Sequence, residues 1–142
     1  QGVSSAASDV YKRQRQVRTD SGGFYIEPTI FDCVDATHAL VREEIFGPVL
    51  TAQRFRSEDE AIALANDSAY GLGAGLWTAN LGRAHRLSRR LRAGLVWVNC
   101  YADGDITVPF GGVKQSGFGR DKSLHALDKY SDLKTTWIDI SL

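Results

Sequence analysis

The segment VREEIFGPVL, residues 41–50, places two adjacent carboxylates directly before an apolar pair and a Gly-Pro turn. A carboxylate buried beside apolar groups loses hydration energy unless a charge or hydrogen-bond donors compensate it. One of Glu43 and Glu44 can point to water. The other lies next to Ile45 and Phe46, so it needs a partner.

Cys100 is a second residue whose type could do chemistry, because it follows an apolar run and begins a long loop. A nucleophilic thiol needs a base, and none of the three histidines (His38, His85 and His125) lies near it in sequence. A free cysteine in such a place is more often a small buried hydrophobe. The other cysteine, Cys33, is distant and has no CxxC or Cys/His spacing, which favours reduced thiols over a disulfide or zinc site.

Three further patterns have ordinary structural explanations. Asp103 and Asp105 lack a third metal ligand, and a turn around Gly104 accounts for them. The GLGAG run at 71–75 follows a helix and precedes a strand, the reverse of a dinucleotide loop. GGVKQSG, residues 111–117, lacks the spacing of a Walker loop. No catalytic set can be assigned from these residues alone.

Composition limits the function classes. The chain has 142 residues, with 43% hydrophobic and 24% charged, as in ordinary soluble proteins. Seventeen basic residues balance seventeen acidic ones, so we expect neither nucleic acid nor a membrane surface as partner. No apolar run approaches the roughly 20 residues that span a bilayer, and residues 1–14 lack a signal-peptide core, which favours a cytoplasmic protein.

Alternating elements must position these residues. Strand character is expected at 23–34, interrupted by Pro28, and at 49–55. A capping box at 57–60 begins a helix that ends at 66–67. A strand at 70–78, a helix after Asn80 closed by Gly94, and a buried strand at 95–98 follow. Residues 121–130 are expected to be helical and 133–140 to form a terminal strand.

This order predicts an α/β fold with a mostly parallel sheet and flanking helices. Ligands of such sheets bind beyond the carboxyl ends of the strands, where Asn99 and Cys100 lie. The loop that follows carries the apolar residues Val108, Pro109 and Phe110, and a loop of that length in a compact domain is usually functional or disordered. We therefore expect a functional loop.

Four motifs taken together resemble the aldehyde dehydrogenases. They are EEIFGP at 43–48, AND-x-x-YGL at 65–72, AGLVWVNC at 93–100, and PFGG-x-K-x-SG-x-GR at 109–120. Their order and spacing match the family over residues 22–142, as expected for the C-terminal part of such an enzyme. A set of four ordered motifs is far more specific than any one of them.

The resemblance implies a reaction in which a cysteine thiolate adds to the aldehyde, hydride passes to NAD or NADP, and a glutamate activates water to hydrolyse the thioester. In the family, the nucleophile, the base and the dinucleotide-binding domain precede EEIFGP. Neither Cys33 nor Cys100 lies in the nucleophile motif. We therefore assign no catalytic residue to this chain and expect it to be inactive by itself.

The resemblance also implies binding residues. Glu44 matches the carboxylate that bonds the nicotinamide ribose hydroxyls, and Phe46 matches the aromatic that packs beside the nicotinamide. For the substrate, Phe110 corresponds to an aromatic that lines the aldehyde channel. The loop that begins at Asn99 is where substrate preference varies within the family. Here that loop carries Asp103 and Asp105, which would favour a cationic amine.

The substrate and assembly follow from the same resemblance. The combination DGD-x-T-VPFGG with RDKSLHALDKY most resembles enzymes that oxidise γ-glutamyl-γ-aminobutyraldehyde and other ω-aminoaldehydes in polyamine breakdown. Residues 15–132 would be part of the catalytic domain. Residues 133–142 would be an oligomerisation strand and tail of a homodimer or homotetramer. The first 14 residues read as a junction or non-native segment, and with no Met the chain looks like a piece of something longer.

Two other function classes stay open. One is a non-catalytic, truncated relative that serves as a binding or assembly piece. The other is a nucleic-acid-binding module that uses the arginines between residues 83 and 92, although their helical distribution favours a solvated face. Upstream sequence would separate the first class from an enzyme, and salt-sensitive oligonucleotide binding would reveal the second.

Overall fold

The computed structural model describes residues 15–141, so the predicted junction segment 1–14 lies outside the described residues. The chain divides into two compact units, Gln1–Leu64 and Ala65–Leu142. The boundary falls within the helix α3 (Glu58–Asn66).

Unit 1 contains two small sheets. Strand β1 (Gln16–Val17) pairs antiparallel with β2 (Tyr25–Ile26), and β3 (Thr29–Asp32) pairs parallel with β4 (Val49–Ala52). The expected interruption of the first strand is confirmed, because residues 27–28 separate β2 from β3. Pro28 has no N–H to give to a ladder, so pairing stops there.

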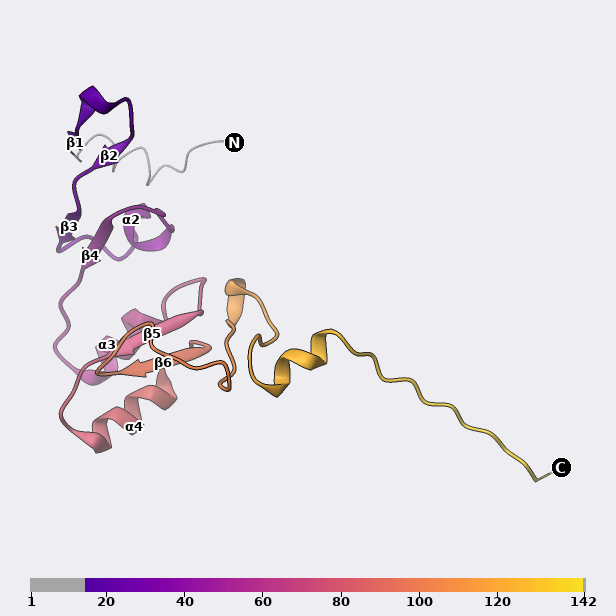
Figure 1. Ribbon diagram of the computed structural model, residues 1–142. Helices are drawn as coiled ribbons and strands as arrows, with labels where there is room; N and C mark the ends of the chain where they lie inside the picture. The colour runs from indigo at the N-terminus through magenta and orange to yellow at the C-terminus, as the bar shows by residue number, and fades with distance from the viewer. Residues whose placement is uncertain (1–14, 142) are drawn as a thin grey trace. The chain divides into compact units, whose positions relative to one another are not determined.

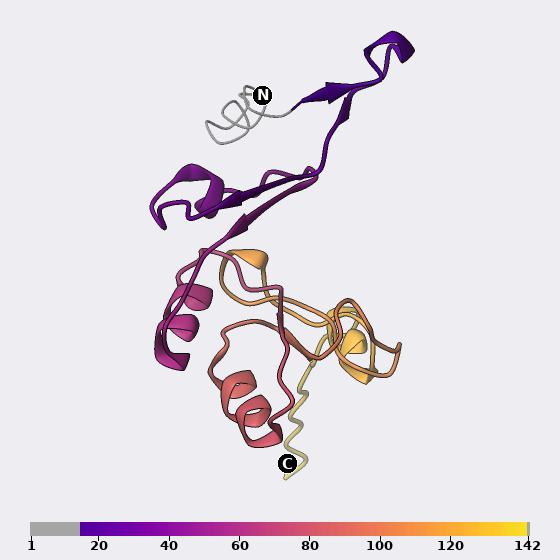
Figure 2. The same ribbon diagram turned by 90° about the vertical axis from the view of Figure 1, so that its left-hand side faces the viewer.

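A short helix, α2 (Ala39–Arg42), lies between β3 and β4 in sequence and carries Leu40, one of the buried residues of unit 1. Its Leu40 is only 8% exposed and packs against Phe31, Ala39, Ile45 and Val49. Figures 1 and 2 both show α2 beside the β3–β4 pair. Nothing in the sequence pattern indicated α2, because four residues are too few to establish a helical period.

Helix α3 begins with the predicted capping box. Ser57 Oγ accepts a hydrogen bond from the Glu60 N–H at 3.2 Å, as expected. The Glu60 carboxylate accepts from the N–H of Arg56 at 2.7 Å, one residue earlier than the standard motif places it. Both bonds satisfy backbone donors at the start of the helix, so the predicted element is confirmed.

Unit 2 is built on a strand–helix–strand arrangement. Strands β5 (Gly73–Leu76) and β6 (Leu95–Val98) pair in parallel, and α4 (Leu81–Arg90) connects them and contacts β6 (Figure 1). Asn80 caps α4 by accepting from the Arg83 N–H at 2.8 Å. The predicted α/β class with parallel pairing is therefore confirmed, although the described strands form separate pairs.

Gly94 does not close α4, which corrects the sequence expectation. The helix ends at Arg90, and the side chain of Asn66 bonds the Arg90 carbonyl at 2.9 Å and the Arg92 N–H at 2.8 Å. Gly94 is needed for a different reason. A Cβ there would collide with the carbonyl of Gly111, so glycine permits the close approach of these two backbones.

The end of unit 2 differs from expectation in one respect. Residues 114–116 and 124–129 form 3₁₀ helices, η2 (Lys114–Ser116) and η3 (Leu124–Lys129), which confirms helical structure within 121–130. Residues 133–140 form no strand in the described chain, and both views draw them as a plain trace (Figures 1 and 2). A strand needs a partner for its backbone groups, and within the described chain this segment pairs with no other.

Candidate cofactor and substrate sites

The EEIFGP segment forms one side of a groove in unit 1. The groove encloses about 340 Å³ and is lined by Leu40, Glu43, Glu44, Ile45, Phe46, Gly47, Val49, Leu50 and Thr51. Helix α2 ends at Arg42 and β4 begins at Val49, so the segment is held at both ends. It therefore projects side chains from a fixed turn rather than from a long loop.

Phe46 has the least ordinary conformation of this turn. Its φ is 52°, a left-handed value that is uncommon for a residue with a side chain, and its ring is 90% exposed. The neighbouring Ile45 instead packs against Leu40. Burial within unit 1 therefore gives no reason for the orientation of Phe46, and the ring face is available to a ligand.

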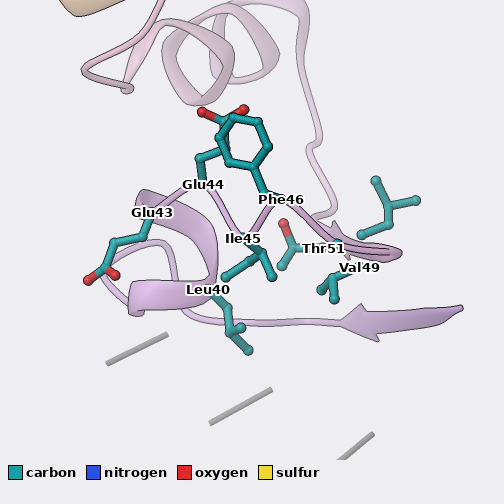
Figure 3. A pocket seen from close by; sticks show the side chains of 9 residues that line it. Leu40, Glu43, Glu44, Ile45, Phe46, Val49 and Thr51 are labelled. Carbon is teal, nitrogen blue, oxygen red and sulfur yellow. The ribbon is translucent and has the colours of Figure 1, made fainter. Parts of the chain in front are cut away.

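The two carboxylates differ in direction. Figure 3 shows Glu44 pointing to the same side of the turn as Phe46, whereas Glu43 points away. Glu43 is half-buried, and its N–H bonds the Ala39 carbonyl at 2.8 Å as the cap of α2. Glu44 is exposed, so its charge keeps its hydration in this unit. A vicinal diol could bond Glu44 while a flat ring packs on Phe46, which fits the nucleotide half of a cofactor.

The four predicted substrate residues all belong to unit 2. Asn99 lies at the end of β6, and its amide accepts from the Thr78 N–H at 2.8 Å and donates to the Thr78 carbonyl at 3.0 Å. Its φ of 59° is again left-handed. These bonds tie together the chain ends that leave β5 and β6, so the described contacts of Asn99 are structural, and its role in substrate binding stays a prediction.

Asp103 lies in an irregular segment, and Asp105 begins a tight turn. Trp97 donates its indole N–H to the Asp103 carbonyl at 2.6 Å, and the Asp103 carboxylate accepts from Gly104 N–H at 2.9 Å. Asp105 accepts from both the N–H and the hydroxyl of Thr107, at 2.8 and 2.7 Å. These two bonds, with a smaller contribution from the Lys122 charge, hold the pKa of Asp105 below its usual value. The carboxylate is exposed and stays negative at neutral pH.

Phe110 is held by backbone pairing. It exchanges two hydrogen bonds with Asp121, at 2.7 and 2.6 Å, and is half-buried. The ammonium of Lys122 lies 5.4 Å from the centre of the Phe110 ring. Sequence reasoning did not give Lys122 a role. The available signal was a charged residue two positions after Arg120, close behind the GR motif.

The remaining candidates from the sequence have no assembled site. Cys33 and Cys100 are both free and exposed, so the expectation that Cys100 is a small buried hydrophobe is wrong for this structure. Within residues 15–141, no three His, Cys, Asp or Glu side chains come together as a metal site. None of the helices in that range is long and apolar enough to cross a membrane.

Comparisons with known proteins agree with the motifs. Residues 1–136 match the sequence profile of the aldehyde dehydrogenase family. The chain is 67% identical over 115 residues to the NADP/NAD-dependent aldehyde dehydrogenase PuuC of Escherichia coli K12, covering 81% of this chain and 23% of PuuC. It is 57% identical to the aminoacetaldehyde dehydrogenase of Pseudomonas aeruginosa, covering 84% of this chain and 24% of that protein.

A solved structure gives the same result for the fold. The γ-glutamyl-γ-aminobutyraldehyde dehydrogenase of Burkholderia cenocepacia J2315 matches with a TM-score of 0.83 and 52% identity, over 92% of this chain and 28% of that one. The chain thus spans about a quarter of the length of the curated relatives it matches. With the profile match over most of its length, the chain belongs to the aldehyde dehydrogenase family.

Proposed function

We propose that this chain is part of an NAD- or NADP-dependent aldehyde dehydrogenase that oxidises an ω-aminoaldehyde to its carboxylic acid. The observation that carries the proposal is the turn that points Glu44 and Phe46 the same way. The reaction consumes an aldehyde, oxidised cofactor and water, and yields a carboxylate, reduced cofactor and two protons. When bound, the nicotinamide accepts the hydride.

In this proposal the residues of unit 1 position the cofactor. The Glu44 carboxylate accepts hydrogen bonds from the ribose hydroxyls without offering a donor of its own. The exposed ring of Phe46 packs beside the nicotinamide and limits its rotation. Positioning of this kind lowers the barrier because the reacting atoms no longer have to search for their alignment.

The residues of unit 2 select the substrate. Asp103 and Asp105 give the loop before Phe110 two negative charges, which attract an aldehyde that ends in an ammonium group. Similarity to an aminoacetaldehyde dehydrogenase and to a γ-glutamyl-γ-aminobutyraldehyde dehydrogenase supports this substrate class. The nucleophilic cysteine and the general base are proposed to come from sequence outside this chain, so the chain by itself should not turn over.

The test measures the dehydrogenase activity of the full-length protein that contains this chain. The absorbance of the reduced cofactor at about 340 nm, which belongs to the cofactor and not to the protein, follows the reaction. NAD and NADP are each offered with propanal, 3-aminopropanal and γ-glutamyl-γ-aminobutyraldehyde. We expect faster turnover of the two amino compounds than of propanal. An inactive full-length protein would favour the non-catalytic alternative. Turnover by the isolated chain would contradict the assignment of nucleophile and base.

A further inference from the structure

Lys122 places a positive charge beside the loop that carries the two carboxylates. Its ammonium lies 5.4 Å from the centre of the Phe110 ring. Its field also reaches Asp105, where it helps to lower the pKa of that carboxyl. The surroundings of Phe110 therefore carry charges of both signs, whereas the sequence indicated only the negative ones.

Backbone bonds fix this arrangement. The two bonds between Phe110 and Asp121, and a third from the Ser123 N–H to the Ile106 carbonyl at 2.7 Å, run residues 121–123 alongside 106–110. Lys122 and Ser123 both have left-handed φ values, 59° and 52°. Two successive residues with side chains rarely take this conformation, and here it directs the Lys122 side chain back over the ring.

Lys122 does not form an ion pair with Asp121, the carboxylate nearest to it in sequence. Asp121 is bonded instead by Lys129, at 2.6 Å. Among the described residues Lys122 forms no ion pair, and its contact with the Phe110 face is of the weak kind that an exposed cation makes. An incoming carboxylate offers this ammonium a stronger, charge-assisted hydrogen bond.

We propose that Lys122 is a specificity-determining residue that binds a carboxylate at the far end of the aldehyde, so that the loop selects substrates with a zwitterionic tail. Asp103 and Asp105 would hold the ammonium of that tail, and Lys122 would hold its carboxylate. A purely cationic aminoaldehyde would use only the acidic half and would be repelled by Lys122. This inference rests on the proposed function and narrows its substrate class.

The test uses the full-length protein and four aldehydes that differ in tail charge: propanal, 3-aminopropanal, succinic semialdehyde and γ-glutamyl-γ-aminobutyraldehyde. Lys122→Met removes the charge but keeps an apolar stem over Phe110, and Lys122→Arg is the matched control that keeps the charge. For the Met variant we expect kcat/KM to fall about tenfold with the zwitterion, stay within about twofold with propanal, and rise with 3-aminopropanal. The Arg variant should retain the preference for the zwitterion.

An equal loss of kcat/KM for all four aldehydes would overturn the inference, because it would show a structural role for Lys122. An unchanged value for the zwitterion would overturn it as well. In both cases the wild-type protein still oxidises aminoaldehydes, so the proposed function stands. If the wild-type protein oxidises none of the four, the proposed function itself fails and the inference falls with it.

Discussion

At the scale of single residues, the two adjacent glutamates have different tasks. Glu43 is half-buried at the end of α2, whereas Glu44 is exposed and points with Phe46 away from the core. The need for a compensating partner, which the sequence raised for one of them, therefore arises for Glu44 only when a ligand covers it. This difference makes Glu43 a matched control for Glu44.

Glu44→Gln in the full-length protein should weaken cofactor binding or misplace the nicotinamide. The amide keeps the size of the side chain but replaces a charged acceptor with one that also carries donors. Loss of a charge-assisted hydrogen bond predicts a fall in kcat/KM for the cofactor of about tenfold or more. Steady-state and single-turnover kinetics would measure it. Glu43→Gln should change little, and equal effects of the two substitutions would contradict the assignment.

The sequence indicated the types and positions of these residues but not their conformations. The motifs named Glu44, Phe46 and Phe110 because chemistry depends on residue type and spacing. The left-handed φ of Phe46 does not follow from its residue type. The placement of Lys122 over a ring goes with backbone hydrogen bonds that join residues 106–110 to 121–123. A single sequence carries no signal for such bonds.

At the scale of elements, helices and strands with clear periodicity were predictable. The strand–helix–strand run β5, α4 and β6 was expected from the sequence because α4 has a helical apolar period after its cap Asn80 and β6 is a short apolar run. The end of α4 was not predictable, because the group that bonds the Arg90 carbonyl is the side chain of Asn66, 24 residues earlier in the sequence. A glycine near the helix end was the local signal, and a distant side chain overrode it.

Asn66→Ala should loosen the end of α4 without unfolding the unit. The substitution removes the acceptor of the Arg92 N–H and the donor to the Arg90 carbonyl. A net loss of about 1 kcal/mol per hydrogen bond predicts that the Arg92 amide exchanges with solvent about fivefold faster. Hydrogen exchange of the full-length protein, resolved at Arg92, measures this.

A matched control variant keeps one of the two hydrogen bonds of the Asn66 side chain. Asn66→Asp retains an oxygen acceptor for the Arg92 N–H but loses the donor to Arg90, so the protection of the Arg92 amide should be largely kept. Equal exchange rates for the wild-type and Ala proteins would show that Asn66 does not hold the helix end.

At the scale of the whole molecule, few apolar side chains are buried. Among the described residues only Leu40, Ile62 and Ala84 form the buried core. Large apolar side chains such as Phe24, Phe118 and Trp137 are almost fully exposed. Each unit leaves many large apolar side chains exposed, so we expect them to be covered by other protein when the full-length protein assembles.

The tail gives this expectation a test. Its residues Leu133, Trp137 and Ile140 are between 87% and 98% exposed, and an unpaired run of Thr, Trp and Ile is a template for strand pairing. We therefore predict that the isolated chain, purified and examined by light scattering, associates as its concentration rises. A homodimer or homotetramer of the full-length protein would use the same segment.

Two tail variants separate association through strand pairing from non-specific apolar association. Trp137→Lys with Ile140→Lys removes apolar side chains, while Thr135→Lys with Thr136→Lys adds the same charge and spares them. Charge on a strand edge discourages pairing in both, but only the first variant also removes apolar contact, so it should lower scattering further. If both variants scattered as much as the wild-type chain, the association would lie elsewhere on the exposed apolar surface. A monomeric wild-type chain at tens of micromolar, roughly the range in which exposed apolar surface causes aggregation, would contradict the prediction altogether.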